Sequence, residues 1–385
     1  MDFELSEDQT LLVESAKRMV ESEIAPILAA NDPERPLDKK EMLRIFAVFA
    51  REGLTAPRLP VEAGGSGMKM LDYGMVYEQL PPVVAISLLS HEVTITRIHA
   101  ESGEEQRRRF LPDAIAGKRI CCTGSTEPDT GSDPRGIKTR VVDDGKHLVV
   151  NGRKMWITNG SISDIAVVTC IGADGGHERS AMRRIAVERA TSPYEAREIP
   201  CLGLQQGHLA ELLFDDCRVP RENMLGQSGD AARVLTVTWN VNRPLMGLSA
   251  VHLAQNALDA AGTYAGMRKQ FGRVIGGTQL VQERLADIAT AVETSRLLCY
   301  KALAQVDCGL RVNGLSAMAK RYATNACLQA ISLAMGVHGA MGISREFRLE
   351  QLFRDARMLL VPDGTNEILA LMIGRELTGI DAFRA

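Results

Sequence analysis

The sequence lacks most of the motifs that mark metal, nucleotide and nucleic-acid binding. Its eight cysteines include no C-x-x-C pair and its seven histidines form no H-E-x-x-H motif, so metal chemistry is not expected. No G-x-G-x-x-G follows a strand-like segment and no Walker A sequence occurs, so neither a Rossmann site nor an NTPase is indicated. A net charge of −3 offers no basic face to nucleic acid.

Membrane and export signals are also missing. There is no uninterrupted apolar run of the roughly 18 residues that a membrane-spanning helix needs. The start, MDFELSEDQT, is acidic and unlike a signal peptide. With 45% hydrophobic and 24% charged residues, the composition is that of an ordinary globular protein. We therefore predict a cytoplasmic protein without membrane association, whose scattered cysteines are reduced and mostly buried.

The periodicity of the chain divides it into three segments. Residues 1–120 are predicted to be helical, beginning with a capping box at Ser6–Gln9 and including a helix over Lys39–Glu52. Residues 121–228 contain short β-type runs between turn signals, which predicts a compact antiparallel domain. These runs are Thr139–Val142, His147–Val150, Ile165–Cys170, Arg184–Val187 and Glu211–Phe214.

Helical spacing returns in residues 229–385. One apolar stripe runs from Val281 to Ser295, and a second comprises Met318, Tyr322, Cys327, Ile331 and Ala334. Long helices with apolar stripes and short connections are typical of a helical bundle. The predicted order of the chain is therefore helical, β, helical.

Four motifs along the chain carry a resemblance. They are TGSTEPDTGSD at residues 123–133, WITNG at 156–160, RKQFG at 268–272, and RDAR followed by DGTNE within 354–367. In this order and spacing they resemble the acyl-CoA dehydrogenase family, and the similarity extends from the opening DFELSEDQ to Leu377, essentially the whole chain.

The resemblance implies a mainly α fold with a central β-domain. An N-terminal helical domain (1–120), a middle antiparallel β-domain (121–228) and a C-terminal four-helix bundle (229–385) are expected, usually in a homotetramer. FAD lies between the β-domain and the helices in this family. Its members insert an α,β double bond into an acyl-CoA thioester and pass electrons to an electron-transfer flavoprotein.

The first two motifs match family positions that contact the flavin. An isoalloxazine ring needs hydrogen-bonding groups at its polar edge and a flat apolar wall beside it. By the resemblance, Ser125, Thr126 and Thr158 supply the polar groups, and Trp156 lies beside the dimethylbenzene end. The alternative interpretation is an N-cap threonine and a core tryptophan.

The third motif matches a corner that reaches the FAD of a neighbouring subunit in the family. There Arg268 would meet the pyrophosphate through a charge-assisted contact, with Gln270 and Phe271 beside it. Gln279 aligns with a glutamine that touches the ADP portion. A solvated basic helix end is the alternative interpretation.

Further matches concern the substrate and the rest of the cofactor. Ser132 aligns with a serine at the pantetheine arm, although an ordinary turn is the alternative. Arg243 matches an arginine near the CoA chain, and Gly364 lies beside the expected base. Thr365 and Glu367 align with residues that close over the adenosine diphosphate.

The predicted catalytic base is Asp363. A C–H group next to a thioester becomes acidic enough to remove when donors hold the carbonyl oxygen as an enolate. A carboxylate shielded from water suits this role because desolvation raises its pKa toward that of the substrate. By the resemblance, the enolate donors are the backbone N–H of Asp363 and a ribityl hydroxyl of FAD.

The base motif departs from the family in one residue type. Pro362-Asp363-Gly364-Thr365 stands where the family usually has Tyr-Glu-Gly-Thr, and the shorter side chain withdraws the carboxylate by about 1 Å, which can cost on the order of 100-fold in rate. Other members carry the base one position before the arginine of the Arg-Pro pair. That residue is Asn242 here, which cannot accept the proton, so Asp363 remains the candidate.

Three other departures affect the cofactor and the acyl pocket. Gly336 replaces a glutamine that contacts FAD, and the loop 203–211 lacks the usual arginine and serine or threonine. FAD affinity is then lower, or a partner subunit supplies the contacts. Glu92 stands where many members have asparagine, and it either binds a polar acyl tail, acts as a second acid or base, or is a paired surface residue.

The sequence leaves three functions open. The first is α,β-dehydrogenation of an acyl-CoA with Asp363 as base. The second is related acyl-CoA chemistry, either enoyl-CoA reduction or an elimination. The third is a non-catalytic partner subunit in a heteromer with an active acyl-CoA dehydrogenase.

Overall fold

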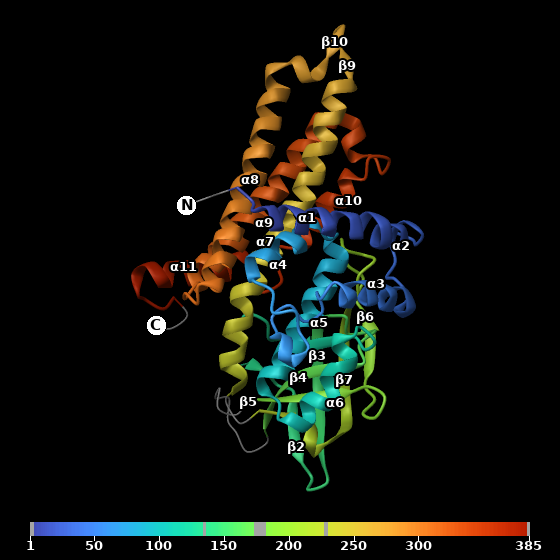
Figure 1. Cartoon of the computed structure of the whole chain (residues 1–385), viewed down its shortest axis with the longest axis vertical. Coiled ribbons are helices and arrows are strands. Elements are labelled where there is room, and N and C mark those ends of the chain that lie inside the picture. The colour runs from blue at the N-terminus through green and yellow to red at the C-terminus, as the bar shows by residue number, and fades with distance from the viewer. Residues whose placement is uncertain (1–3, 134–135, 173–181, 227–229, 383–385) are drawn as a thin grey trace.

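The order of secondary structure follows the predicted order. The computed structural model describes residues 4–133, 136–172, 182–226 and 230–382. Helices come first, strands occupy the middle of the chain, and long helices follow (Figure 1). The predicted mainly helical architecture with a central β-domain is confirmed.

The N-terminal part consists of six α-helices among the described residues. These are α1 (Glu7–Met19), α2 (Ala25–Ala29), α3 (Lys39–Arg51), α4 (Met70–Gln79), α5 (Pro82–Glu101) and α6 (Glu104–Ile115), with a π-helical turn at Val20–Ile24 joining α1 to α2. The capping box is present, because the Ser6 hydroxyl accepts from the Gln9 N–H and the Gln9 side chain accepts from the Ser6 N–H. Helix α3 confirms the predicted second helix.

The β-domain is one mixed sheet in the order β6-β7-β3-β2-β4-β5-β8, with β1 paired to β4. Its strands are β1 (Cys121–Gly124), β2 (Arg140–Asp143), β3 (His147–Thr158), β4 (Ile165–Gly172), β5 (Met182–Glu188), β6 (Glu195–Glu198), β7 (Leu209–Pro220) and β8 (Met224–Leu225). The antiparallel prediction holds for most neighbours but is wrong for β1–β4 and β2–β4, which are parallel. Strand β1 was not predicted, because it is almost entirely buried and shows no alternation.

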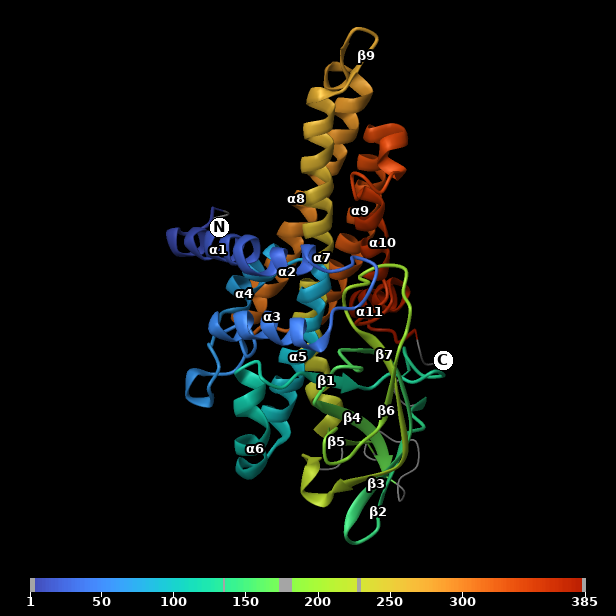
Figure 2. The same cartoon turned by 90° about the vertical axis from the view of Figure 1, so that its right-hand side faces the viewer.

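Three long helices form the body of the C-terminal part. They are α7 (Asp230–Met267), α8 (Gln279–Asp307) and α9 (Asn313–His338), and the hairpin β9 (Lys269–Gln270) and β10 (Arg273–Val274) joins α7 to α8. Two short helices, α10 (Leu349–Met358) and α11 (Asn366–Thr378), pack against α9. Helices α7 and α8 extend beyond the rest of the molecule and carry the hairpin at their far end (Figure 2).

Helix α9 lies at the centre of this bundle. Among the described residues, the segment Asn313–Ile343 is the one stretch long and apolar enough to cross a membrane by length and composition. However, α9 packs against α7, α8, α10 and α11, so its apolar side chains serve the core of the bundle.

The second predicted apolar stripe is only partly correct. Cys327, Ile331 and Ala334 are buried, but Met318 and Tyr322 are exposed. The buried face of α9 in this region is made of small residues such as Ala319 and Ala323, which allow α7 and α8 to approach closely. A pattern based on large apolar residues therefore selected the wrong face at the start of the helix.

His91 joins the helical part to the sheet. Its ring is fully buried on α5, with Nε2 3.0 Å from the Ala114 carbonyl oxygen and Nδ1 accepting the Cys121 N–H at 3.0 Å. These bonds define the neutral tautomer that carries its proton on Nε2. Protonation at Nδ1 would place a second hydrogen against the Cys121 N–H, and burial lowers the pKa of His91 to about 4.

We expect this histidine to weaken the fold in acid. Because its folded pKa lies below the ordinary value of 6.5, the unfolded chain takes up the proton first, and stability is lost as pH falls from 6.5 to 4. The loss attributable to His91 is on the order of 3 kcal/mol. Denaturant unfolding of wild type and His91→Gln at several pH values measures it, since the variant should lack this part of the decline. Parallel curves for the two proteins would contradict the assignment.

Candidate active site

Asp363 lies in a tight turn between α10 and α11. Two successive residues of this turn have left-handed backbone conformations, with φ of +55° at Asp363 and +100° at Gly364. Glycine adopts this region without strain, and aspartate is among the few other residues that tolerate it. Thr365 then caps α11, its hydroxyl accepting the Ile368 N–H. The half-buried Asp363 side chain is thus presented at the tip of a turn defined on both sides by helices.

Two buried cations hold the backbone of this turn. Lys320 Nζ on α9 donates to the carbonyl oxygens of Leu360, at 3.1 Å, and Gly364, at 2.6 Å. Arg243 Nε on α7 donates to the Asp363 carbonyl oxygen at 3.2 Å. Because peptide units are planar, holding the Asp363 and Gly364 carbonyls also fixes the direction of the N–H groups of Gly364 and Thr365.

The surroundings of Lys320 shift its pKa in opposite directions. Burial lowers the pKa of Lys320 to about 7, the charge of Asp363 raises it, and Arg243 lowers it further. One turn along α9, the Thr324 hydroxyl lies 3.1 Å from the donating Asn366 side-chain amide at the start of α11. The α9 face therefore anchors both ends of the Asp363 turn.

Replacing Lys320 by methionine should loosen this turn without removing the base. With Asp363 as the base that the resemblance to acyl-CoA dehydrogenases predicts, we expect kcat with an acyl-CoA to fall by about 10- to 100-fold, since small displacements of a base are costly, with a much smaller change in KM. Lys320→Arg should retain more activity, and Lys301→Met, on the exposed side of α8, serves as the control. Steady-state kinetics with unchanged kcat in Lys320→Met would contradict the positioning role.

The charge of the Asp363 carboxylate influences several buried polar groups. Burial lowers the pKa of Arg97 to about 9 and also lowers that of Arg243, while the Asp363 charge opposes both shifts. Burial raises the pKa of Tyr77, and the Asp363 charge raises it further. The charge of Asp363 therefore acts on buried side chains of α4, α5 and α7.

The structure brings the predicted flavin-contacting residues of the first two motifs together. The Met155 N–H on β3 donates to the Thr126 carbonyl oxygen at 2.9 Å, so the loop after β1 lies along β3. The Ser125 hydroxyl is 3.2 Å from the Thr169 hydroxyl on β4. This loop and the end of β3 thus form one side of a common surface.

A buried ion pair shapes the same loop. Lys154 and Glu127 have side chains that are almost completely buried, and their charged atoms lie 2.7 Å apart. Glu127 also accepts the backbone N–H groups of Lys138 and Thr139, at 2.7 and 2.9 Å. One carboxylate therefore ties residue 127 to Lys138, Thr139 and β3, and the exposed Ser132 lies between these positions in the sequence.

Trp156 does not lie in the core. It is 50% exposed and has a φ of +62°, a strained conformation for an aromatic residue. The alternative of a core tryptophan is therefore wrong. The neighbouring Thr158 ends β3 and its carbonyl oxygen accepts the Ser90 hydroxyl at 3.2 Å. An open indole face beside this half-buried threonine suits a flat ring system.

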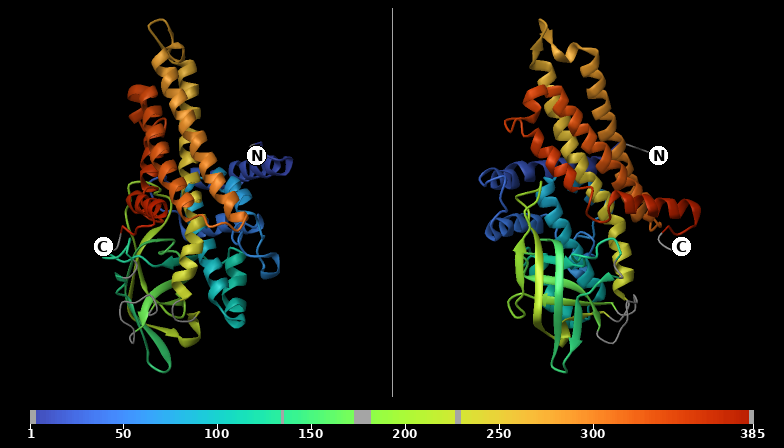
Figure 3. Two further views of the ribbon diagram at one scale, coloured as in Figure 1. Left: turned by 90° about the vertical axis from the view of Figure 1, so that its left-hand side faces the viewer. Right: turned by 180° about the vertical axis from the view of Figure 1, so that it is seen from behind.

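The residues of the third motif lie far from this surface within one chain. Arg268, Gln270 and Phe271 occupy the hairpin end of α7, and Gln279 begins α8, at the opposite end of the molecule from the β-domain (Figure 3). All four side chains are exposed. A single chain therefore does not bring them to the Asp363 turn.

Thr365 and Glu367 line a cavity of about 500 Å³ between α9, α10 and α11. Arg321 and Arg357 also line it, and the sequence analysis did not select them. Arg357 could have been selected from the sequence, because it belongs to the RDAR motif. Nothing in the sequence around Arg321 indicates that it lines a cavity. Two guanidinium groups in a cavity with threonine and asparagine side chains suit a phosphate-bearing ligand.

The loop that lacks the usual family residues is held by other means. The Arg354 guanidinium on α10 donates to the Leu202 carbonyl oxygen at 3.0 Å and to the Gln205 side chain at 2.7 Å. The Asp355 carboxylate accepts the Leu204 N–H at 2.5 Å.

Gly336, where the family usually has a glutamine, is exposed near the end of α9. No group of side chains suited to hold a metal ion occurs among the residues described.

Comparison with known proteins shows similarity along almost the whole chain. Family models for the N-terminal, middle and C-terminal domains of acyl-CoA dehydrogenases match residues 6–118, 122–217 and 231–378. A cyclohex-1-ene-1-carbonyl-CoA dehydrogenase of Syntrophus aciditrophicus is 33% identical over 97% of this chain and 91% of its own. An acryloyl-CoA reductase (NADH) of Anaerotignum propionicum is 30% identical over 98% of this chain and 96% of its own.

Solved structures agree with these matches. A glutaryl-CoA dehydrogenase in complex with glutaryl-CoA superposes with a TM-score of 0.91 at 30% identity, covering 100% of this chain and 98% of that one. A glutaryl-CoA dehydrogenase from Mycobacterium smegmatis in complex with FADH2 gives 0.89 at 26% identity, covering 99% and 97%. The chain therefore belongs to the acyl-CoA dehydrogenase family of flavin-dependent oxidoreductases, which confirms the resemblance and agrees with FAD as the predicted cofactor.

Proposed function

We propose that this protein is an FAD-dependent acyl-CoA dehydrogenase in which Asp363 removes the α-proton of the substrate. The observation that carries the proposal is the turn that presents Asp363, whose carbonyl oxygens are held by the buried side chains of Arg243 and Lys320. A base held in this way stays within reach of a substrate atom, which is what proton transfer requires.

The residues around this base have separate tasks. The Asp363 N–H is the proposed donor to the thioester oxygen, and Gly364 leaves room for the substrate beside it. Arg243 and Lys320 place positive charge behind the turn, which favours the developing enolate. Ser132 is proposed to contact the pantetheine arm.

The chain also offers groups that fit FAD, which when bound accepts the hydride from the β-carbon. Ser125, Thr126 and Thr158 are proposed to bind the polar edge of the flavin, and Trp156 to cover its dimethylbenzene end. Thr365 and Glu367 are proposed to close over its adenosine diphosphate. The open indole face and the arginine-lined cavity support these assignments.

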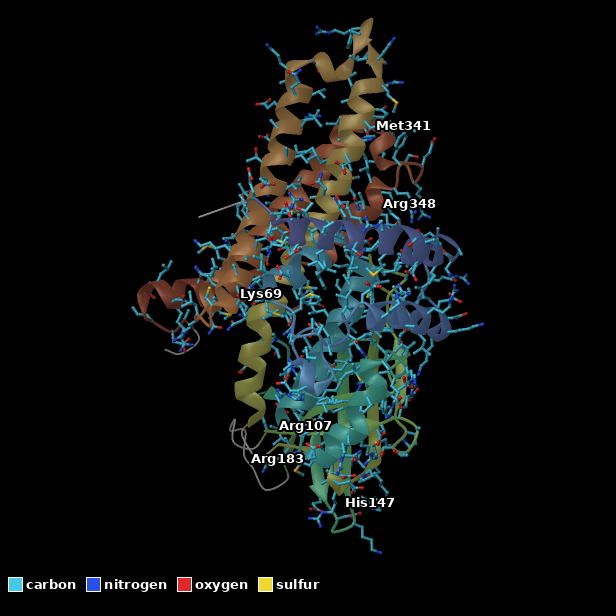
Figure 4. The ribbon with its side chains drawn as sticks, viewed as in Figure 1. Lys69, Arg107, His147, Arg183, Met341 and Arg348 are labelled. Carbon is cyan, nitrogen blue, oxygen red and sulfur yellow. The ribbon has the colours of Figure 1, made fainter. Side chains whose placement is uncertain are left out.

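A homotetramer is the proposed assembly. Arg268, Gln270, Phe271 and Gln279 reach the FAD of another subunit in this proposal, which explains why they lie so far from Asp363 in one chain. Side chains of the outer part of α7 and α8 project into open space (Figure 4). Exposed apolar side chains at this end are Met267 on α7, Phe271 and Val274 in the hairpin, and Leu280 on α8. A cytoplasmic location and an electron-transfer flavoprotein as acceptor belong to the same proposal.

The test uses the purified full chain with a panel of acyl-CoA thioesters and an artificial electron acceptor. Bound FAD, acyl-CoA-dependent reduction of the acceptor and release of enoyl-CoA are the expected results. A colourless protein that takes up no FAD would contradict the proposal and favour a non-catalytic partner subunit of a heteromer.

Enoyl-CoA reduction is the second candidate, because the similar acryloyl-CoA reductase shows that this fold is compatible with that direction. Anaerobic mixing separates the two directions. Bleaching of the flavin by saturated acyl-CoA supports dehydrogenation. A flavin that saturated thioesters leave oxidised, but whose reduced form enoyl-CoA reoxidises rapidly, supports reduction. An elimination would release product without net flavin reduction.

A further inference from the structure

A buried ion pair connects the N-terminal helices with α7. The Glu92 side chain on α5 is 0% exposed, and Nη2 of Arg58, in the loop after α3, lies 2.5 Å from its carboxylate. The same Nη2 donates to the side-chain oxygen of Asn242 at 2.8 Å. The sequence interpretation of Glu92 as a paired surface residue is therefore half correct. Glu92 is paired, with Arg58, but it is buried, because helices and the sheet enclose α5.

This pairing leaves several buried hydrogen-bonding atoms unused. Glu92 Oε2, Arg58 Nε and the nearby Tyr73 hydroxyl make no hydrogen bond of normal geometry among the described residues. Burial raises the pKa of Glu92 to about 7, and the Thr96 side chain lies close enough to oppose that rise without completing the set of bonds. Native proteins retain few such atoms, and those that remain usually meet water or a ligand. A purely structural ion pair does not explain why the Glu92 oxygen, Arg58 Nε and the neighbouring Tyr73 hydroxyl lack these bonds.

The pair lies beside the proposed catalytic base. Asn242 precedes Arg243 on α7, and Arg243 Nε donates to the Asp363 carbonyl oxygen. Two hydrogen bonds therefore link the pair to the Asp363 turn through neighbouring residues of α7, Asn242 and Arg243. An acyl chain that leaves a thioester at Asp363 along this side of α7 would extend toward the pair.

We propose that the Arg58–Glu92 pair recognises an uncharged polar substituent, a hydroxyl, on the acyl chain of the substrate. This inference rests on the proposed function and deepens it. The free Glu92 oxygen would accept the hydroxyl hydrogen, and Arg58 Nε would donate to the hydroxyl oxygen. A second carboxylate would gain little, because the charges of the pair cancel. A plain hydrocarbon chain would leave both atoms unpaired.

The experiment compares matched acyl-CoA thioesters of equal length, with and without a hydroxyl at each carbon beyond the β-carbon. FAD-loaded full chain and an artificial acceptor give kcat/KM for each. We expect at least one hydroxylated thioester to exceed its plain counterpart by about tenfold or more. If plain thioesters react and no hydroxylated one is preferred, buried water completes the pair and the inference is overturned while dehydrogenation stands. If no thioester reacts, the proposed function falls and this inference with it.

Two variants locate the hydroxyl. The double variant Arg58→Met/Glu92→Met replaces the pair with apolar side chains, a change that buried ion pairs usually tolerate, and should abolish or reverse the preference. Glu92→Gln keeps the shape and should weaken the preference several-fold. An unchanged preference in the double variant would show that the hydroxyl binds elsewhere and would overturn the assignment.

Discussion

Replacing Asp363 by asparagine should lower the rate of flavin reduction by saturated acyl-CoA by about 1,000-fold or more, because the amide cannot accept the α-proton. FAD should remain bound, since the substitution leaves the turn and its contacts with Arg243 and Lys320 intact. Anaerobic stopped-flow absorbance of the flavin measures the rate. The loss should appear in the chemical step and only weakly in substrate binding.

A matched control separates the loss of this carboxylate from the loss of any carboxylate. Asp113→Asn removes an exposed acid on α6 and should reduce the flavin at the wild-type rate. Substantial activity in Asp363→Asn would mean that another group takes the proton. Glu92 would then be the first candidate, because it is a buried carboxylate whose partner Arg58 also contacts Asn242, the neighbour of Arg243 on α7.

The largest effect on stability is expected from Lys154→Met. This change leaves the Glu127 carboxylate buried without its cation, and breaking a buried pair in this way usually costs about 3–5 kcal/mol. The loop 125–139 should lose its anchor at the same time, because Glu127 also holds the Lys138 and Thr139 N–H groups. We therefore expect both a lower denaturation midpoint and weaker FAD retention.

A second substitution tests whether the cost arises from the unpaired charge. Adding Glu127→Gln to Lys154→Met removes that charge and should restore part of the stability, so the two effects should not be additive. Lys146→Met, in an exposed turn of the same domain, is the control and should unfold like wild type. Equal midpoints for Lys154→Met and this control would contradict the structural role of the ion pair.

Local patterns predicted the architecture well where one face of an element is buried. The Ser6 capping box and the helix at Lys39 follow from residues a few positions apart, and both are present. Strand β1 and the start of α9 could not be predicted in this way. Their burial depends on neighbours that are distant in sequence, and on alanine faces that carry little hydrophobic signal.

The candidate site shows the same division. A motif was enough to select Asp363. The cations that hold its turn are distant in sequence: Arg243 on α7 lies 120 residues before Asp363, and Lys320 on α9 lies 44 residues before Gly364. Nothing near Lys320 or Arg58 in the sequence indicates that either is buried. Arg268 and its neighbours raise a different difficulty, because a single chain leaves them exposed and away from Asp363.

The most direct test of the account is hydrogen exchange at the α-carbon of an acyl-CoA. The FAD-loaded protein is incubated with saturated thioester in deuterated buffer without an electron acceptor, and recovered substrate is analysed by mass spectrometry. We predict deuterium at the α-carbon with wild type and none with Asp363→Asn. Equal incorporation by both proteins would contradict Asp363 as the base.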